Sequence, residues 1–415
     1  MKTILFGAGA SFPFYETHLS TRYLNGKIND IDSWANIVKK YQEIDDSSYT
    51  IPNPSDINDV ISAIMSYMPN ANFEQVAEII DKISSHGYDC LPCNNMLNLL
   101  FATYRVSPIC TASWNHVPFF YREIIANAII DSEIHHRVPH YNELQLKQQN
   151  FIKAIKDSSE NKMSVISLNY DDCVPTSIDN IEDIEYCFTT DTGRHNNELN
   201  VQEFITAPYV AYFPHGHLRF VFNDEQNVTY YSNIHEAERV RWSGLNNNGV
   251  IDIVKTPFSY DFNTFLTTGQ TKDSAFNNMP YAVYYQRLAK DLLESKEIYL
   301  IGYSFGDLHF NRLLKAFLLI DRSNVVYIID KYDAAITMTD EYQDDNNLIT
   351  KIQQVFSPEW KIIFDRDSNQ KIAFNEEEVK KVNNMGYGKI FDQIVFYKKG
   401  YEEFLSEYND VIIKC

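Results

Sequence analysis

The chain has 415 residues and a formal net charge of −20 at pH 7. This length allows one large domain or about two to three ordinary ones, with a sizeable core. A chain this acidic repels a phosphate backbone, so direct binding of nucleic acid is disfavoured, whereas docking on a basic protein partner is not. The apolar share of 44%, with 14% aromatic residues, is typical of a globular protein and excludes a disordered one.

No segment predicts a membrane span or an export signal. The apolar run at the N-terminus is short and is interrupted by Gly7, and no stretch of about 18 apolar residues occurs. The six cysteines lack the spacing of a disulfide framework, which favours reduced thiols. We therefore expect a soluble protein of the cytoplasm.

The first part of the chain predicts one strand followed by a block of helices. Residues 2–6 form an apolar run that leads directly into Gly-Ala-Gly-Ala-Ser, as a buried strand ending in a tight turn does. Helical periodicity then dominates, and a capping-box pattern at Asn72 and Gln75 marks one helix start. The helices expected here are 55–68, 72–85, 118–131 and 141–156. We assign about 13–160 to a helical insertion.

Strands resume after the insertion and alternate with helices. They are expected at 163–168, 208–213, 297–301 and 324–329, with a hairpin at 218–222 and 227–231 and a helix at 281–295. Such alternation predicts an α/β fold, a Rossmann-like parallel sheet with helices on its faces. Residues 1–330 are assigned to this domain. Residues 331–415, with a strand-like run at 360–364 and a helix near 374–383, are assigned to a small mixed α/β extension.

Four polar clusters share one position, directly after a predicted strand. They are 7–11, 169–172, 214–217 and 302–307. In open α/β sheets, ligands bind outside the carboxyl ends of the strands. The four clusters together therefore predict a single site at that edge of the sheet.

The fourth cluster contains Gly-x-Ser-x-Gly, the pattern of a nucleophile elbow with Ser304 as nucleophile. An α/β-hydrolase needs an acid and then a histidine after this serine, but only His309 follows, inside the helix that the elbow itself would begin. The esterase hypothesis therefore fails. What remains is a helix N-terminus suited to a phosphate or a ribose hydroxyl, with Asp307 as the N-cap.

The first cluster has two of the three glycines of a dinucleotide-binding Gly-x-Gly-x-x-Gly loop. Phe12 stands at the third position, and no strand ending in an acid follows about twenty residues later. An ordinary dehydrogenase is therefore disfavoured. Two interpretations stay open, a nucleotide-binding loop and a tight turn that merely needs small residues.

Taken in order, the motifs resemble those of the sirtuin family. The chain carries Gly-Ala-Gly-Ala-Ser at 7–11, Asn169-x-Asp171, His215-Gly216, Gly302-x-Ser304 and a late strand ending at Asp330. Sirtuins carry Gly-Ala-Gly-x-Ser, Asn-x-Asp, His-Gly and Gly-Thr-Ser in the same order. The long helical block and the Gly-Tyr-Ser-Phe-Gly-Asp variant look like the bacterial sirtuin-like proteins of anti-phage defence, which hydrolyse NAD.

One feature of sirtuin deacylases is missing. Their structural zinc is held by four cysteines placed after the His-Gly, whereas here the only Cys-x-x-Cys, Cys90 and Cys93, precedes it and has no partner pair. Histidines give no metal site either, because Pro139 breaks the helical face that His136 and His140 would share. No metal is expected.

The resemblance implies specific roles at the site. Asn169 would bind the attacking water or the ribose hydroxyls, His215 would act as general base or orient the ribose, and Asp171 would position the carboxamide or brace its loop. Independently of the resemblance, His217 lies two residues after His215 and would point away from it if the strand continues, so we expect it behind the site. By the resemblance, the dinucleotide would be bound in two parts. Gly7, Ala8, Gly9 and Ser11 would cradle the pyrophosphate through backbone amides, with Phe12 beside them, and Gly302, Ser304 and Asp330 would hold the adenosine half. Alternatively, Asn169 and Asp171 only cap a turn, and His215 is an ordinary loop histidine.

The function implied is a metal-independent NAD glycohydrolase that acts as an effector of anti-phage defence. Such an enzyme must be held inactive in healthy cells, so control by homo-oligomerisation or by a protein partner is expected. For this family, the partner implied is a HerA-type DNA-translocating ATPase or another sensor. The alternatives are a non-catalytic subunit that senses NAD or ADP-ribose and an NAD-dependent protein deacylase, which the absent zinc module disfavours.

Overall fold

The structure, a computed structural model, is built on one mostly parallel sheet of seven strands. It describes residues 1–17, 19, 21–44, 53–69, 71–85, 117–188, 199–222, 228–232, 234–243, 279–334, 336, 348–356, 376–391 and 393–414. Across the sheet the strands are β3 (Tyr209–Tyr212), β2 (Met163–Ser167), β1 (Lys2–Phe6), β6 (Glu297–Ile301), β7 (Val325–Ile329), β9 (Ile394–Tyr397) and β8 (Tyr387–Phe391). All neighbours pair in parallel except β8 and β9. The predicted α/β class with a parallel sheet is confirmed.

The strand register brings the polar clusters to one level. The central strand β1 pairs with β2 on one side and with β6 on the other, and Phe6 lies opposite both Ser167 and Ile301. These three strands are buried along almost their whole length, as strands covered on both faces are. Their last residues therefore end side by side, and the loops that follow leave the same edge of the sheet.

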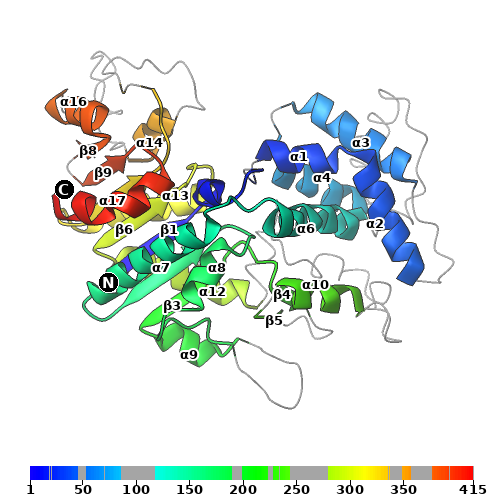
Figure 1. The fold of residues 1–415 in the computed structure, drawn as a ribbon, viewed down its shortest axis with the longest axis horizontal. Coiled ribbons are helices and arrows are strands. Elements are labelled where there is room, and N and C mark those ends of the chain that lie inside the picture. The colour runs from blue at the N-terminus through cyan, green and yellow to red at the C-terminus, as the bar shows by residue number, and fades with distance from the viewer. Residues whose placement is uncertain are drawn as a thin grey trace.

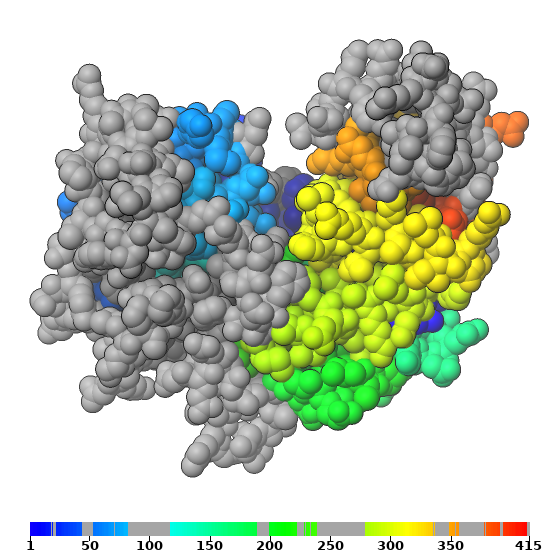
Figure 2. Space-filling view, turned by 180° about the vertical axis from the view of Figure 1, so that it is seen from behind, coloured from blue at the N-terminus to red at the C-terminus, as the bar shows by residue number. Residues whose placement is uncertain are grey.

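Helices cover both faces of the sheet (Figure 1). One face carries α7 (Tyr141–Asp157) and α17 (Tyr401–Lys414), where the ring of Phe151 contacts the rings of Tyr299 and Phe404. The other face carries α12 (Tyr281–Glu294), whose Asp291 accepts a hydrogen bond from Ser164 at 2.6 Å. Beside it lies α13 (Leu308–Ile320), and Figure 2 shows α12 and α13 forming the surface of this face.

The helices of the insertion form a block beside the sheet (Figure 1). They are α1 (Thr21–Ile28), α2 (Ile31–Ile44), α3 (Pro54–Tyr67), α4 (Phe73–Ser85) and α6 (Val117–His135). Inside the block, Arg122 of α6 makes a two-pronged buried ion pair with Asp81 of α4 at 2.8 and 2.6 Å. The capping box is confirmed, since the side chains of Asn72 and Gln75 each accept the other residue's amide at 2.9 Å. The sequence did not predict α1 and α2.

The insertion is shorter than predicted. Its expected end near residue 160 includes α7, but α7 packs on the sheet through Phe151 and belongs to the sheet's own helical layer. The insertion therefore ends with α6. Its boundary matches the break expected from Pro139, because α6 ends at His135 and α7 begins at Tyr141.

The predicted C-terminal extension is not separate from the sheet. Strands β8 and β9 are its last two strands, and Tyr401 of α17 donates a hydrogen bond to Gln148 of α7 at 3.0 Å. A boundary at residue 330 therefore cuts through one sheet, because Ile329 of β7 pairs with Tyr397 of β9. Helix α16 (Glu376–Met385) confirms the helix expected near 374–383, and α14 (Leu348–Phe356) precedes it. The run at 360–364 lies outside the described residues.

The remaining elements are short. The expected hairpin is present as β4 (Phe220–Phe222) and β5 (Val228–Tyr230). The helices near it are α8 (Cys173–Ile178), α9 (Val201–Thr206) and α10 (Ile234–Ser243), and a 3₁₀ helix, η1 (Ala8–Phe14), follows β1. Within the described part of the chain, no helix combines the length and apolar character that crossing a bilayer requires.

Candidate functional site

Loops from four parallel strands and the helical insertion surround one cavity of about 240 Å³. It opens at the carboxyl end of the sheet between β1 and β6, where the strand order runs from β1 to β2 and β3 in one direction and to β6 and β7 in the other. This is the topological switch point at which open α/β sheets bind ligands. The sequence-predicted residues that line it are Gly7, Ala8, Ser11, Asn169, Asp171, His215 and Ser304.

Four other predicted residues do not line the cavity. They are Gly9, Phe12, Gly302 and Asp330. The Phe12 side chain is 39% exposed on the outside of η1. Asp330 follows β7, two strands from β1, and burial raises the pKa of its carboxyl to about 6.

The glycines of the first loop serve close packing of the backbone. The amide of Gly7 donates to the Ile301 carbonyl at 2.8 Å, and the amide of Gly9 donates to the Gly302 carbonyl at 3.0 Å. A Cβ on Gly7 would lie 2.6 Å from the Gly302 oxygen. The predicted pyrophosphate cradle is therefore corrected for Gly7 and Gly9, because the carbonyls of Ile301 and Gly302 at the end of β6 already accept these two amides. The interpretation as a tight turn describes Gly7 and Gly9.

Asn169, Ser11 and Asp171 form a buried chain of hydrogen bonds. Asn169 Nδ2 donates to the Gly7 carbonyl at 2.9 Å and to Ser11 Oγ at 2.8 Å, and Ser11 Oγ donates to Asp171 Oδ2 at 2.6 Å. The other carboxylate oxygen of Asp171 accepts the amide of Cys173 at 3.0 Å. Asp171 therefore braces the loop. The side-chain oxygen of Asn169 is the atom of that amide left for a ligand.

His215 pairs with the acid that begins α13. Its Nε2 lies 3.3 Å from Asp307 Oδ2, within ion-pair distance, and the residue is buried at the cavity wall, with 6% of its surface exposed. Asp307 Oδ1 accepts the amides of His309 and Phe310, so the N-cap predicted for this residue is confirmed. In the tautomer that is protonated on Nε2, this proton faces the carboxylate and the lone pair lies on Nδ1. The sequence did not predict this pairing, because the two residues belong to different strand loops.

His217 stands behind the cavity, as expected. Its Nε2 donates to the Asp171 carbonyl at 2.7 Å, and its Nδ1 accepts the amide of Arg219 at 3.1 Å. Burial lowers the pKa of His217 to about 4, so the ring is neutral at physiological pH. It fastens the His-Gly loop to the Asn-x-Asp loop and holds His215 and Asn169 in place.

Ser304 lines the cavity but does not have the geometry of a nucleophile elbow. The left-handed residues of its turn are Gly302, with φ of 59°, and Phe305, with φ of 57°. The serine side chain is exposed, and the imidazole of the cavity is paired with Asp307. Ser304 is therefore an exposed residue of the cavity lining and not a positioned nucleophile.

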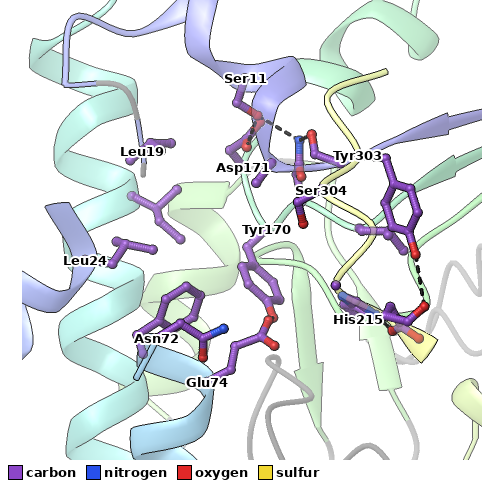
Figure 3. A pocket seen from close by; sticks show the side chains of 18 residues that line it. Ser11, Leu19, Leu24, Asn72, Glu74, Tyr170, Asp171, His215, Tyr303 and Ser304 are labelled. Carbon is purple, nitrogen blue, oxygen red and sulfur yellow. Dashed lines mark hydrogen bonds and ion pairs between the residues drawn. The ribbon is translucent and has the colours of Figure 1, made fainter. Parts of the chain in front are cut away.

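The helical insertion supplies the wall opposite His215 (Figure 3). The insertion residues that line the cavity are Leu19, Leu24, Asn72, Phe73, Glu74 and Ile129. Tyr170, from the Asn-x-Asp loop, donates its hydroxyl to Glu74 Oε1 at 3.0 Å and sets its ring edge-on to Phe73. None of these residues was predicted, because no local pattern reveals which part of an insertion folds back over a distant strand end.

The cavity is acidic. Glu74, Asp171 and Asp307 contribute carboxyl groups, and among the described residues that line it none is Lys or Arg. Burial raises the pKa of Asp171, which favours its neutral form and weakens its part in this negative charge. Such a lining attracts a cationic group and repels phosphate.

A buried acid ties the insertion to the loop after β2. Glu133 of α6 accepts hydrogen bonds from the Tyr15 hydroxyl and from the amide of Asp172, the latter at 2.8 Å, while Arg137 donates to its second oxygen at 3.0 Å. Burial, with the neighbouring Asp172 and Asp171, raises the pKa of Glu133 to about 7. Ionisation of Glu133 therefore lowers the free energy of unfolding at neutral pH.

Because folding raises this pKa, the folded protein binds the extra proton more tightly, and this stabilisation is lost as the pH rises through about 7. Glu133→Gln should remove that part of the pH dependence, on the order of 3 kcal/mol between pH 4.5 and 8. Urea unfolding of parent and variant across this pH range measures it. Glu294→Gln, on an exposed side chain of α12, is the control. Equal pH slopes for the parent and Glu133→Gln would contradict the assignment.

No cluster of three or more candidate metal ligands occurs within the described ranges. The pair His136 and His140 is divided between the ends of two helices, where each lies near an acid, Asp131 at 3.5 Å and Glu402 at 3.1 Å respectively. Cys90 and Cys93 lie outside the described residues.

Comparison with models of protein families and with curated proteins found no match for this chain. What the site does is therefore argued from its own residues.

Proposed function

We propose that this protein hydrolyses NAD to nicotinamide and ADP-ribose. The observation that carries the proposal is the convergence of four loops, distant in sequence, around one cavity at the switch point of the sheet. Ser11, Asn169, His215 and Ser304 come from four different strand ends and meet there. Polar loops that shared no ligand would have no reason to line the same cavity.

The size and charge of the cavity favour the nicotinamide–ribose half of NAD. At about 240 Å³ it is smaller than the roughly 300–1,000 Å³ pockets that enclose a whole ligand of drug size. The oxidised nicotinamide ring is a cation, which suits carboxylate walls, whereas the pyrophosphate carries negative charge and suits the exposed mouth beside Ala8 and Ser304.

The chemistry needs little from the protein. The bond between the ring nitrogen and C1′ of the ribose breaks with its electron pair going to the nitrogen, so the leaving group departs neutral and needs no proton. Water adds to the oxocarbenium-like carbon, as in glycoside hydrolysis. His215, oriented by Asp307, accepts the proton of this water, and the side-chain oxygen of Asn169 accepts a hydrogen bond from the water or a ribose hydroxyl.

A second candidate is a non-catalytic sensor of NAD or ADP-ribose. It is favoured by the hydrogen bonds that Asn169 and Asp171 make within the protein, which stiffen the cavity wall. A sensor binds the nucleotide without turnover. An enzyme releases nicotinamide.

We further propose that the hydrolase is an effector of anti-phage defence. Uncontrolled loss of NAD would be toxic, so its activity is restrained by self-association or by a separate partner. The resemblance to sirtuin-like defence proteins favours a HerA-type ATPase or another sensor as this partner.

The test is to incubate purified protein with NAD, alone and with the product of the neighbouring gene, and to separate the products by chromatography. Release of equal amounts of nicotinamide and ADP-ribose in either sample supports hydrolysis. Tight binding of NAD with no nicotinamide in both samples favours the sensor. Neither binding nor turnover would contradict both.

A further inference from the structure

We propose that Glu133 is a positioning residue for the reaction, through which the helical insertion holds Asn169 in place. This inference rests on the proposed function and concerns how the cavity is held, not what it binds. Glu133 belongs to α6 and is buried. Ile129, about one turn earlier on the same side of this helix, lines the cavity. One helix of the insertion therefore reaches both the cavity and the loops that build it.

A single carboxylate oxygen of Glu133 joins two segments that carry cavity residues. This oxygen, Oε1, accepts hydrogen bonds from the Tyr15 hydroxyl and from the Asp172 amide, the latter at 2.8 Å. Tyr15 is the C-cap residue of η1, the 3₁₀ helix that contains Ser11. Asp172 lies in the loop after β2 that also carries Asn169. The carboxylate therefore clamps η1 to the Asn-x-Asp loop.

This clamp is a second link between the same two segments. The first is Ser11 Oγ, which accepts from Asn169 Nδ2 at 2.8 Å and donates to Asp171 Oδ2 at 2.6 Å. A loop that is held at one point can still turn about that point, whereas a loop held at two points cannot. The two links together fix the direction of the Asn169 amide, whose oxygen is the atom left for the water or the ribose. A displacement of about 1 Å at such a group is enough to slow a reaction about 100-fold.

A buried acid can also be a purely structural contact, as Asp81 is in its ion pair with Arg122. That pair lies within the insertion, whereas Glu133 bonds to segments that belong to the carboxyl edge of the sheet. Burial also raises the pKa of Glu133 to about 7, so its ionised form is disfavoured in the folded protein at neutral pH. Stability alone therefore does not account for an acid here, but an oxygen that accepts two donors at once does.

Substitutions of Glu133 separate the shared oxygen from the charge. Glu133→Ala removes this acceptor, and we expect kcat for nicotinamide release from NAD to fall about 10–100-fold, with KM changed less than about threefold. Glu133→Gln keeps an oxygen that can accept both hydrogen bonds and should retain most of the parent kcat. Its amide nitrogen then faces Arg137, whose side chain is 44% exposed and can turn to the solvent. Steady-state kinetics of the full-length protein, under the conditions in which the parent is active, give both constants.

Tyr15→Phe tests the clamp without emptying a buried site. The ring keeps its place, because backbone hydrogen bonds hold residues 14–16 to residues 136–138. We expect kcat to fall about three- to tenfold, with little change in KM. Tyr141→Phe is the matched control, since its ring lies 6.2 Å from that of Tyr15 and its hydroxyl accepts from Gln145 instead. It should leave kcat unchanged and shift the urea midpoint about as much as Tyr15→Phe does.

The outcomes separate the inference from the proposed function. A lower urea midpoint with the parent kcat in both Tyr15→Phe and Glu133→Ala would mean a purely structural role and would overturn the inference. Equal losses of kcat in Tyr15→Phe and Tyr141→Phe, or in Glu133→Ala and Glu133→Gln, would overturn it as well. If Glu133→Ala does not fold, the comparison of the two tyrosine variants decides. In each of these cases nicotinamide release by the parent leaves the proposed function standing. A parent that releases none, alone or with its partner, would end both.

Discussion

Replacing His215 with alanine is expected to lower NAD turnover by a factor of about 10²–10⁴, the usual contribution of a positioned general base. The imidazole lies at the cavity wall with Nε2 directed at Asp307, and the substitution removes the nitrogen that takes the proton of the attacking water. Nicotinamide release under single-turnover conditions measures the effect. Circular dichroism and the urea midpoint show whether the fold persists.

Two further variants separate chemistry from structure. Asp307→Asn keeps an oxygen that can cap α13 but loses the charge beside His215, so turnover should fall less than in His215→Ala and the urea midpoint should change little. His309→Ala removes an exposed histidine of the same helix that does not line the cavity, and turnover should be unchanged. Turnover that is the same in the parent and in His215→Ala would remove this histidine from the mechanism.

Gly302→Ala is expected to destabilise the protein by about 2–5 kcal/mol, from a left-handed backbone that resists a side chain and from overpacking. Gly302 has φ of 59°, and its added Cβ would lie 2.2 Å from the Ala10 nitrogen and 2.4 Å from the Gly9 carbonyl carbon. These contacts are backbone atoms, which cannot turn aside as a side chain can. The turn after β6 and η1 would have to separate.

Two glycines provide matched controls for the urea midpoint. A Cβ on Gly306, in the same turn, would meet only Ser304 Oγ at 3.5 Å, an ordinary contact, so Gly306→Ala should cost little. Gly26 is exposed in α1 with nothing within 4 Å of its added Cβ, and Gly26→Ala should stabilise by about 0.5–1 kcal/mol. A Gly302→Ala protein as stable as the Gly306→Ala protein would contradict the close-approach account.

Sequence patterns were sufficient for the strands that form the centre of the sheet. Strands β1, β2, β6 and β7 are short apolar runs, buried on both faces, that stop at Gly, Asn or Asp, so both their existence and their ends can be inferred. Strand β9 is equally buried but only four residues long and is followed by Lys398 and Lys399. Its membership of the sheet depends on pairing with β7, which no local pattern reveals.

For the site, too, some features could be predicted from the sequence and others could not. Ser11, Asn169, His215 and Ser304 were predictable because each follows a strand end, and a parallel sheet brings such ends together. The residues that these side chains contact could not be predicted. The pairing of His215 with Asp307 and the hydrogen bond from the Gly7 amide to the Ile301 carbonyl of β6 arise from how these segments approach one another in space.

The helical insertion shows most clearly what local sequence patterns cannot predict. Helices α3, α4 and α6 were predictable from periodicity and capping, whereas α1 and α2 were not predicted. The contribution of Glu74 to the cavity depends on the angle at which the block meets the sheet. Only a tertiary contact, the hydrogen bond from Tyr170, makes that contribution visible.

A crystal structure of the His215→Ala variant with NAD bound would address the placement of the substrate most directly. We expect the nicotinamide ring and its ribose between Glu74 on the insertion side and Asn169 on the sheet side, with the pyrophosphate outside near Ser304. A nucleotide whose nicotinamide lies away from these residues, for example beside Asp330 with the cavity filled by adenine, would contradict the account.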